Sequence, residues 1–263
     1  MKLEGCTALI TGASAGIGRE FARQLAGHAG ALVLVARRAN RLQELHDELA
    51  SHHPSLKVQI RRADLSRAEE VSALAEWIEG EKIAIDLLIN NAGLGDRGPF
   101  ATSDPERLED MLQVNMVALT TLTHRLLPPM LTRRHGAILN VSSCASFLPL
   151  PGLGVYAATK AYVTSFSEAL KTELRGSGVS VTALCPGPVH TEFDQVARRP
   201  TDPNQRTAPE VAYVAADEVV RAALKGLLRE KPIVIPGVAM KLAMLIVRLT
   251  PIPLLRLAGR ASA

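Results

Sequence analysis

A tyrosine and a lysine stand four residues apart in the segment LPLPGLGVYAATKAY, at Tyr156 and Lys160. If a helix begins near the tyrosine, a residue four positions later projects from the same face, so the phenol and the ammonium become neighbours. A nearby ammonium favours the phenolate and would lower the tyrosine pKa from its usual value of about 10. Ser143 supplies a hydroxyl that can donate a hydrogen bond to the same reacting oxygen. The spacing therefore indicates general acid–base chemistry on an oxygen atom.

A glycine-rich turn near the N-terminus is typical of a phosphate-binding loop. In TGASAGIGREFARQL, Gly12, Gly16 and Gly18 stand between a β-like run and a segment with helical periodicity. Glycines let the backbone approach a pyrophosphate, and a helix N-terminus offers unpaired N–H groups and the positive end of the helix dipole. The alternative is a turn that only needs positive φ angles. The position after the first predicted strand favours a dinucleotide site.

Two arginines at the end of the second predicted strand indicate which dinucleotide is bound. NAD-binding chains carry an acidic residue there, which accepts the hydroxyls of the adenosine ribose. This chain reads VARRANRL, with Arg37 and Arg38 at that place. A guanidinium fork matches a 2′-phosphate and offers no acceptor to a bare ribose. The predicted cofactor is therefore NADP(H), although the same arginines, with Arg41, could simply solvate the start of a helix.

Short apolar runs alternate with longer helical patterns along the chain. Strands are expected at residues 7–11, 31–37, 58–64, 85–93, 136–143 and 179–187. Several of them are apolar throughout, as in a parallel sheet that helices cover on both faces. Helices are expected at residues 16–26, 41–50, 68–79, 105–127 and 156–175. The alternation predicts an α/β fold, a doubly wound, Rossmann-like and predominantly parallel sheet in a single domain over residues 1–263.

The glycine spacing, GxxxGxG, resembles the cofactor loop of the short-chain dehydrogenase/reductase family. NNAG at residues 90–93 resembles the second signature of that family, at the end of its fourth strand. Ser143, Tyr156 and Lys160 match its Ser…Tyr-x-x-x-Lys pattern in order and spacing. The resemblance covers roughly residues 5–193. It implies hydride transfer between NADP(H) and a carbonyl or alcohol carbon, with Tyr156 protonating the alkoxide and Lys160 also binding the nicotinamide ribose.

The family resemblance implies that Asn115 is a fourth catalytic residue. Asp104 and Pro105 are a typical start for a helix with an apolar stripe, and Asn115 falls on that stripe, beside Leu108, Met111, Leu112, Leu119, Leu122 and Leu126. The periodicity alone leaves open whether this amide is structural or functional. The resemblance implies that it supports a water-linked proton relay to the lysine.

The resemblance also implies which residues surround the cofactor. They are Gly12, Ser14, Gly16, Ile17, Gly18, Arg37, Arg38, Asp64, Leu65, Asn91, Ala92, Gly93, Tyr156, Lys160, Pro186, Gly187, Val189 and Thr191. Asp64 would contact the adenine, or else cap the next helix. Pro186 and Gly187 would shape the nicotinamide pocket, and Thr191 would contact the carboxamide or the phosphate. No metal site is predicted.

Composition argues against several other classes of protein. The formal net charge is +4, the basic residues are scattered among 26 acidic ones, and aromatic residues make up 3% of the 263 residues, so nucleic-acid binding is not implied. The three cysteines are too widely spaced for a zinc site or a disulfide framework, which predicts a reducing, cytoplasmic location. Cys144 is interpreted as a small buried residue rather than a reactive thiol.

The C-terminal segment, residues 238–260, is strongly apolar but is interrupted by charges and prolines. Its longest uninterrupted apolar run covers residues 242–247, whereas a membrane-spanning helix needs roughly 20 residues. We expect a helix that packs on its own domain or on a partner subunit. A helix lying on a membrane surface is the alternative.

The predicted substrate is a moderately large apolar ketone or aldehyde, or the corresponding alcohol. Its pocket would be lined by Leu94, Phe100, Phe147, Leu148, Leu150 and Leu153. Residues 194–216 and the C-terminal segment would supply the lid and the substrate wall. A sensor that binds NADP(H) without turnover is the rival interpretation. The family resemblance implies a homodimer or homotetramer, paired through the helices that contain Pro105 and Tyr156.

Overall fold

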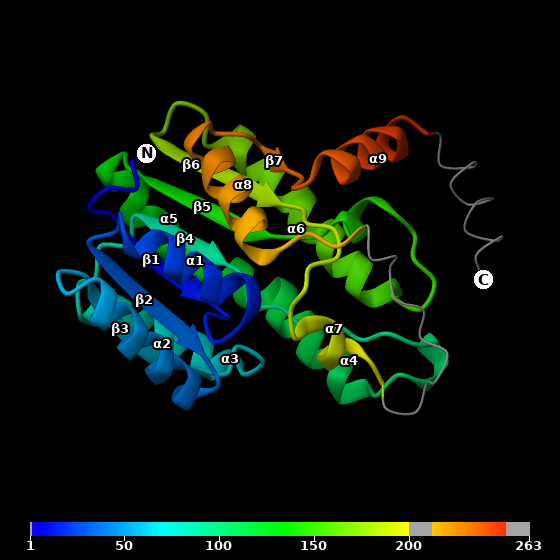
Figure 1. Cartoon of the computed structure of the whole chain (residues 1–263), viewed down its shortest axis with the longest axis horizontal. Coiled ribbons are helices and arrows are strands. Elements are labelled where there is room, and N and C mark those ends of the chain that lie inside the picture. The colour runs from blue at the N-terminus through cyan, green and yellow to red at the C-terminus, as the bar shows by residue number, and fades with distance from the viewer. Residues whose placement is uncertain (1, 200–211, 251–263) are drawn as a thin grey trace.

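The computed structural model describes residues 2–199 and 212–250, which contain a seven-stranded sheet (Figure 1). The strands are β1 (Thr7–Thr11), β2 (Ala31–Ala36), β3 (Lys57–Arg62), β4 (Leu87–Asn90), β5 (Gly136–Val141), β6 (Val179–Leu184) and β7 (Ile233–Val234). Their spatial order is β3-β2-β1-β4-β5-β6-β7, and each neighbouring pair is parallel. The prediction of a doubly wound parallel sheet is confirmed. Most of the predicted lid, residues 200–211, lies outside the described residues, as do residues 251–263.

Helices cover both faces of the sheet. One face is covered by α1 (Gly16–Ala26), α2 (Ala39–His52) and α8 (Ala216–Leu228), and the other by α3 (Ala68–Gly80), α5 (Leu119–Arg133) and α6 (Gly154–Glu173). Three further helices, α4 (Pro105–Leu112), α7 (Phe193–Ala197) and α9 (Val238–Leu249), lie beyond the carboxyl ends of the strands (Figure 1). Single turns η1 (Phe100–Thr102) and η3 (Cys144–Phe147) lie in the loops after β4 and β5.

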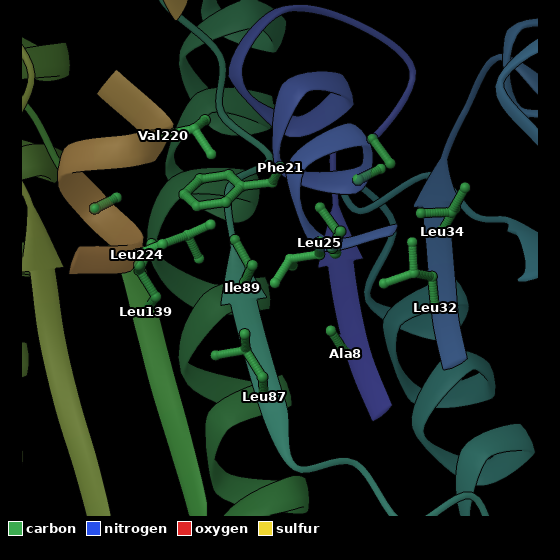
Figure 2. Close-up of a cluster of buried hydrophobic side chains, with 14 of the residues drawn as sticks. Ala8, Phe21, Leu25, Leu32, Leu34, Leu87, Ile89, Leu139, Val220 and Leu224 are labelled. Atoms are coloured by element: carbon green, nitrogen blue, oxygen red, sulfur yellow. The ribbon is translucent and has the colours of Figure 1, made fainter. Parts of the chain in front are cut away.

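The apolar core forms because the central strands are buried on both faces. All residues of β4 and β5 are buried. Figure 2 shows Phe21 of α1 and Val220 of α8 packed over Ile89 and Leu139 of these strands. Each such side chain that leaves water contributes about 1.5–3 kcal/mol. By contrast, the edge strand β3 is largely exposed and basic, which blunts its tendency to pair with another chain.

The helix expected at residues 105–127 is longer and less regular than predicted. Its middle, Gln113–Ala118, is a π-helical segment (η2) between α4 and α5. A π turn contains an extra residue and rotates the buried face, so Leu112 is 40% exposed although it belongs to the predicted stripe. Asn115 stays buried at 1% exposure. Single π turns are frequent at functional sites, and this one carries a predicted catalytic residue.

The last turns of α5 continue through Pro128 and Pro129, where the prediction ends the helix. Proline removes a backbone donor and disfavours the helix interior. Met130 is fully buried, and a Cβ on Gly136 would lie 2.7 Å from its Cγ, so tight packing beneath β5 overrides this preference. Two helices, α7 and α8, and the two-residue strand β7 are not among the predicted elements.

An ion-pair cluster fastens α1 to α2. Glu48 accepts hydrogen bonds from Arg19 at 2.9 Å and from Arg23 at 2.6 and 3.0 Å. These contacts, with the Arg23 hydrogen bond as the largest, lower the pKa of Glu48 from 4.5 to about 2. A carboxylate whose pKa falls on folding stabilises the native state above its unfolded pKa, and that stabilisation is lost as the pH falls toward the folded value.

We therefore expect Glu48→Gln to lower the free energy of unfolding at pH 7 by up to about 1 kcal/mol, since the cluster is only partly buried. The difference from the unsubstituted protein should shrink below pH 4.5, where the unfolded carboxylate becomes protonated. Urea unfolding at pH 7, 5, 4 and 3 measures this. Glu44→Gln, on the exposed part of the same helix, is the control. A pH-independent difference would show that the effect is not electrostatic.

Candidate active site

The site begins where the sheet reverses its order between β1 and β4, which opens a crevice at the carboxyl ends of the strands. Side chains join the two strand ends there. Thr11 Oγ1 accepts hydrogen bonds from the backbone N–H groups of Asn91 and Ala92, each at 3.0 Å. Asn91 Nδ2 donates to the Thr11 carbonyl at 2.8 Å. Gly12 (φ +67°) lies against this junction, and a Cβ there would stand 2.9 Å from Ala92 Cα, so only glycine fits.

A continuous cavity of about 570 Å³ lies above the crevice. Each predicted cofactor residue lines it except Gly18, which packs beneath the turn against Asn91 and Gly12. The first helical residue is Gly16, and the residue before it, Ala15, makes no side-chain cap. The N–H groups of the first turn of α1 are therefore left for an anion. The glycine cradle and the uncapped helix fit the pyrophosphate of a dinucleotide.

The predicted 2′-phosphate arginines lie at one end of this cavity. Arg38 donates to Ser14 Oγ at 3.2 and 3.3 Å and to Glu192 Oε2 at 2.9 Å. Arg37 lies 3.9 Å from a carboxylate oxygen of Asp64. The Asp64 carboxylate also accepts hydrogen bonds from the N–H and hydroxyl of Ser66, at 3.0 and 2.9 Å. Asp64 therefore forms a turn just before α3, in addition to lining the cavity.

The predicted acid–base residues meet at the middle of the cavity. Tyr156 lies in the first turn of α6, and Ser143 follows β5, where its hydroxyl accepts a hydrogen bond from the Ala145 N–H at 3.1 Å. Ser143 is thus the cap of η3 rather than the last residue of the strand. Lys160 is 4% exposed, and its Nζ donates to the Val141 carbonyl at 2.9 Å and lies 5.7 Å from the centre of the Tyr156 ring.

The expected lowering of the Tyr156 pKa by Lys160 is wrong for this structure. Burial raises the pKa of Tyr156 to about 12, and the hydrogen bond with Ser143 opposes this only in part. Burial also lowers the pKa of Lys160 to about 8. The lysine ammonium faces the tyrosine ring and a backbone carbonyl, so its charge does not act on the phenol as the spacing suggested. The phenol therefore stays protonated near neutral pH.

Asn115 lies behind the cavity and does not line it. Its Oδ1 accepts from the Leu94 N–H at 2.8 Å, and its Nδ2 donates to the Leu94 carbonyl at 2.9 Å and to Thr159 at 3.0 Å. A Cβ on Gly93 would stand 3.3 Å from Lys160 Nζ and 3.4 Å from Asn115 Oδ1, so both side chains press on the same glycine. Asn115 is therefore in place to position the loop after β4 beside the lysine.

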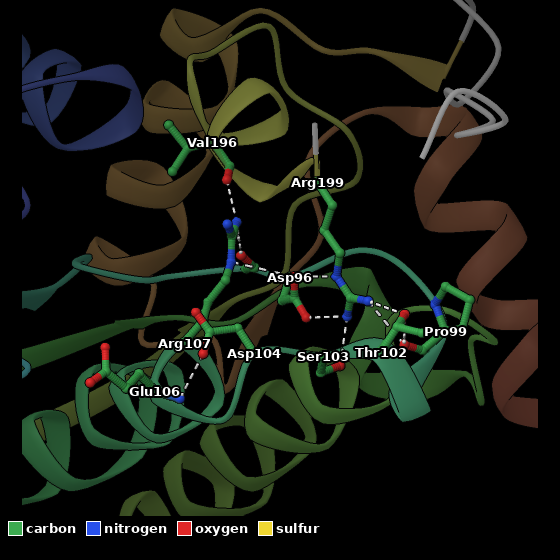
Figure 3. A network of polar contacts seen from close by, with 10 residues as sticks. Asp96, Pro99, Thr102, Ser103, Asp104, Glu106, Arg107, Val196 and Arg199 are labelled. Atoms are coloured by element: carbon green, nitrogen blue, oxygen red, sulfur yellow. Dashed lines mark hydrogen bonds and ion pairs between the residues drawn. The ribbon is translucent and has the colours of Figure 1, made fainter. Parts of the chain in front are cut away.

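A network of charged side chains joins α7 and the residues after it to the loop after β4 and to α4 (Figure 3). The Asp96 side chain is 2% exposed; it accepts from Arg199 at 2.9 and 2.5 Å, and Arg107 lies 3.3 Å away. Arg199 lowers the pKa of Asp96, chiefly through its hydrogen bond, so the carboxylate stays charged. Arg107 also binds the Val196 carbonyl at the end of α7. This cluster holds α7 against the loop after β4, with the Phe193 ring 5.4 Å from that of Tyr156.

The apolar wall of the cavity differs in part from the prediction. Leu94, Leu148, Leu150 and Leu153 line it as expected. Phe100 is instead 73% exposed on η1, and Phe147 lies outside the cavity with Arg248 stacked on its ring at 5.5 Å. The cavity is also lined by five residues that are not individually predicted: Glu192, Phe193, Val196, Met240 and Met244. The HTEF segment contains the first two, and the methionines come from the apolar C-terminal segment that was expected to form a substrate wall.

Comparison with known proteins identifies the family. A family model described as short chain dehydrogenase matches residues 6–202. The chain belongs to the short-chain dehydrogenase family. It is 38% identical over 190 residues to the NADP-dependent 3-hydroxy acid dehydrogenase YdfG of Escherichia coli K12, covering 72% of this chain and 75% of that protein.

Two solved structures are similar over nearly the whole chain. A short-chain dehydrogenase from Sphingobium yanoikuyae in complex with NADPH has a TM-score of 0.79 and 35% identity, covering 92% of each chain. A bulky-bulky ketone specific alcohol dehydrogenase from Comamonas testosteroni has a TM-score of 0.77 and 33% identity, covering 92% of this chain and 90% of that one. The chain is an NADP-dependent oxidoreductase, and the prediction of NADP(H) as cofactor is confirmed.

Two further expectations concern cysteines and membranes. Cys144 is buried, and its thiol donates to the Cys185 carbonyl at 3.2 Å, so its interpretation as a small buried residue is confirmed. Burial raises its pKa to about 12, which disfavours the reactive thiolate. Within residues 2–199 and 212–250, no helix has both the length and the apolar character that a membrane crossing requires. The same residues contain no group of histidine, cysteine and acidic side chains arranged around a metal ion.

Lys160 gives a prediction for the pH profile of the reaction. Because its pKa is about 8, the ammonium loses its charge above that pH, and kcat/KM for carbonyl reduction should fall there, tenfold per pH unit at most. Lys160→Arg keeps the charge and should move this descending limb upward by at least one unit. Steady-state kinetics with NADPH from pH 6 to 10 measures both profiles. An unchanged limb in the arginine variant would assign the titration to another group.

Proposed function

We propose that this protein reduces a moderately large apolar ketone or aldehyde with NADPH, or oxidises the corresponding secondary alcohol. One observation carries the proposal: the Tyr156 and Ser143 hydroxyls lie in a cavity with arginines at one end and an apolar wall at the other. The wall is made of Leu94, Leu148, Leu150, Leu153, Phe193, Val196, Met240 and Met244. The name of the Comamonas relative, a dehydrogenase specific for bulky-bulky ketones, supports this substrate class.

The residues of this chain have separate tasks in such a reduction. Bound NADPH would supply the hydride that such a reduction requires. The Tyr156 phenol, protonated because of its raised pKa, donates its proton to the developing alkoxide. Ser143 donates a hydrogen bond to the same oxygen and stabilises its charge. Lys160, charged below pH 8, is in place to bind the nicotinamide ribose from the floor of the cavity.

We expect Tyr156→Phe to reduce kcat for ketone reduction by roughly 10²–10⁴-fold, since a positioned proton donor contributes about that much. The measurement follows NADPH oxidation in the presence of a panel of aliphatic, bicyclic and steroid ketones. NADPH affinity, measured by fluorescence quenching, should change little because the phenol is not among the phosphate-binding groups.

Tyr162→Phe is the matched control, because that hydroxyl forms a hydrogen bond with Thr120 of α5 and Tyr162 does not line the cavity. A Tyr156→Phe variant that binds NADPH and reduces ketones at the original rate would remove the proposed mechanism. If the unsubstituted protein binds NADPH but turns over no ketone, aldehyde or alcohol, the rival interpretation as a sensor is supported instead.

Oligomerisation and location extend this proposal. The family resemblance implies a subunit interface at the helices that contain Pro105 and Tyr156. Leu112 at the end of α4 and Val117 in the π-helical segment after it are apolar residues exposed at 40% and 47%. We infer a homodimer or homotetramer paired through this face. The three free cysteines suit the cytoplasm.

The outer face of α9 favours a second candidate role, attachment to a membrane surface. Met244 faces the cavity, but one side of the helix exposes an apolar stripe made of Val238, Leu242, Leu245, Ile246 and Leu249. Residues 231–263 contain five basic residues and no acidic one. An apolar stripe in a basic segment suits the surface of an anionic bilayer.

If α9 binds membranes, Leu242→Ser/Ile246→Ser should lower the fraction of protein that sediments with phosphatidylserine-containing vesicles at least twofold, since both side chains leave the lipid. Activity on a soluble ketone should not change, because neither residue lines the cavity. Ala239→Ser is the control. If the double variant and the unsubstituted protein sediment equally with the vesicles, α9 does not attach the protein to membranes. A change in the oligomeric state of the double variant would instead show that the stripe contacts a second copy of the chain.

A further inference from the structure

Glu192 connects two parts of the cavity that are far apart in sequence. It follows Thr191 and precedes α7, yet its carboxylate accepts hydrogen bonds from Arg38 at 2.9 Å and from Arg41 at 2.5 Å. Arg38 and Glu192 both line the cavity. The Glu192 carboxylate therefore binds Arg38, a guanidinium that is also predicted to bind the 2′-phosphate of NADP(H).

The donors of Arg38 are already committed in this arrangement. Its Nε and Nη2 bind Ser14, and its Nη1 binds Glu192. Arg37, by contrast, has only a loose contact of 3.9 Å with Asp64, so it is the more available cation for an incoming phosphate. A phosphate dianion that reaches Arg38 meets the Glu192 carboxylate at close range, and two like charges beside one guanidinium repel each other.

We propose that Glu192 is an internal counter-ion of the 2′-phosphate site, which binds Arg38 and Arg41 and is exchanged for the phosphate when NADP(H) enters. The exchange penalises phosphate binding, because the ion pairs with Glu192 must be given up. The residue after Glu192, Phe193, packs on the Tyr156 ring, so the exchange takes place one residue away from a side chain that contacts the proposed proton donor. This inference rests on the proposed role of the two arginines.

The geometry explains why such an exchange is feasible. Glu192 and Arg38 side chains are each 43% exposed and that of Arg41 is 34% exposed, so water can solvate the separated charges. Exposed ion pairs are weak. A weak pair can hold the arginines in place without preventing the entry of a ligand that carries two negative charges.

The test compares two nucleotides that differ only in the 2′-phosphate, adenosine 2′,5′-bisphosphate and adenosine 5′-monophosphate. Removing the competing carboxylate in Glu192→Gln should tighten binding of the bisphosphate roughly two- to fivefold, the range expected for an exposed ion pair. Binding of the monophosphate should stay within error. Isothermal titration calorimetry at low salt gives both dissociation constants, without any turnover of substrate.

Glu79→Gln is the matched control, because Glu79 also forms an exposed pair with an arginine, Arg125 at 2.9 Å, but does not line the cavity. Weaker bisphosphate binding in Glu192→Gln would overturn the exchange and show that Glu192 orients the arginines for the phosphate. If neither the unsubstituted protein nor the variant binds the bisphosphate more tightly than the monophosphate, both the assignment of the arginines to the 2′-phosphate and the exchange are wrong. Preserved preference with no effect of the substitution overturns the exchange alone.

Discussion

The junction between β1 and β4 is the constraint on which the site depends. The connections that leave β1 and β4 run in opposite directions, so a crevice opens between the carboxyl ends of these two strands. Side chains must join the two strand ends there. Thr11 and Asn91 do this by satisfying backbone groups of the opposite strand. The glycine turn can approach the cofactor only because Gly12 and Gly18 leave room for that junction. The glycine turn that forms the phosphate site therefore packs directly on the junction between β1 and β4, and neither could change without the other.

Acid–base chemistry is arranged on the next strand and helix by burial rather than by direct pairing. Lys160 is held by the Val141 carbonyl, and the room for its ammonium depends on the missing side chain at Gly93. Asn115 fixes the loop on the other side of that glycine through a π-helical turn. Lys160 and Asn115 are thus positioned by backbone contacts, which change little when side chains elsewhere vary.

Much of this arrangement could be predicted from the sequence, because it depends on local patterns. Apolar runs and glycine spacing are enough to place the first six strands and the phosphate turn. Ser143 follows a predicted strand, and Tyr156 and Lys160 lie at the start of the next predicted helix, which is enough to predict that all three meet at one edge of the sheet. The tyrosine pKa was predicted wrongly because no local pattern records burial, which raises this pKa, and because the ammonium four residues away faces the tyrosine ring and a backbone carbonyl. Phe100 and Phe147 were misplaced for a similar reason, since the direction of a loop side chain depends on distant contacts. The pairing of Glu192 with Arg38 joins residues 154 positions apart and has no local signature.

The contact between α9 and the strand-end loop after β6 has a consequence for the breadth of the reaction. A Cβ on Gly187 would stand 2.6 Å from the Met240 Cε, so a methionine lies directly against the predicted nicotinamide pocket, and Met244 extends the same wall. Methionine side chains are unbranched and polarizable, and they adapt to different shapes at little cost. A wall built from methionine side chains can therefore adapt to bound molecules that differ in size and shape.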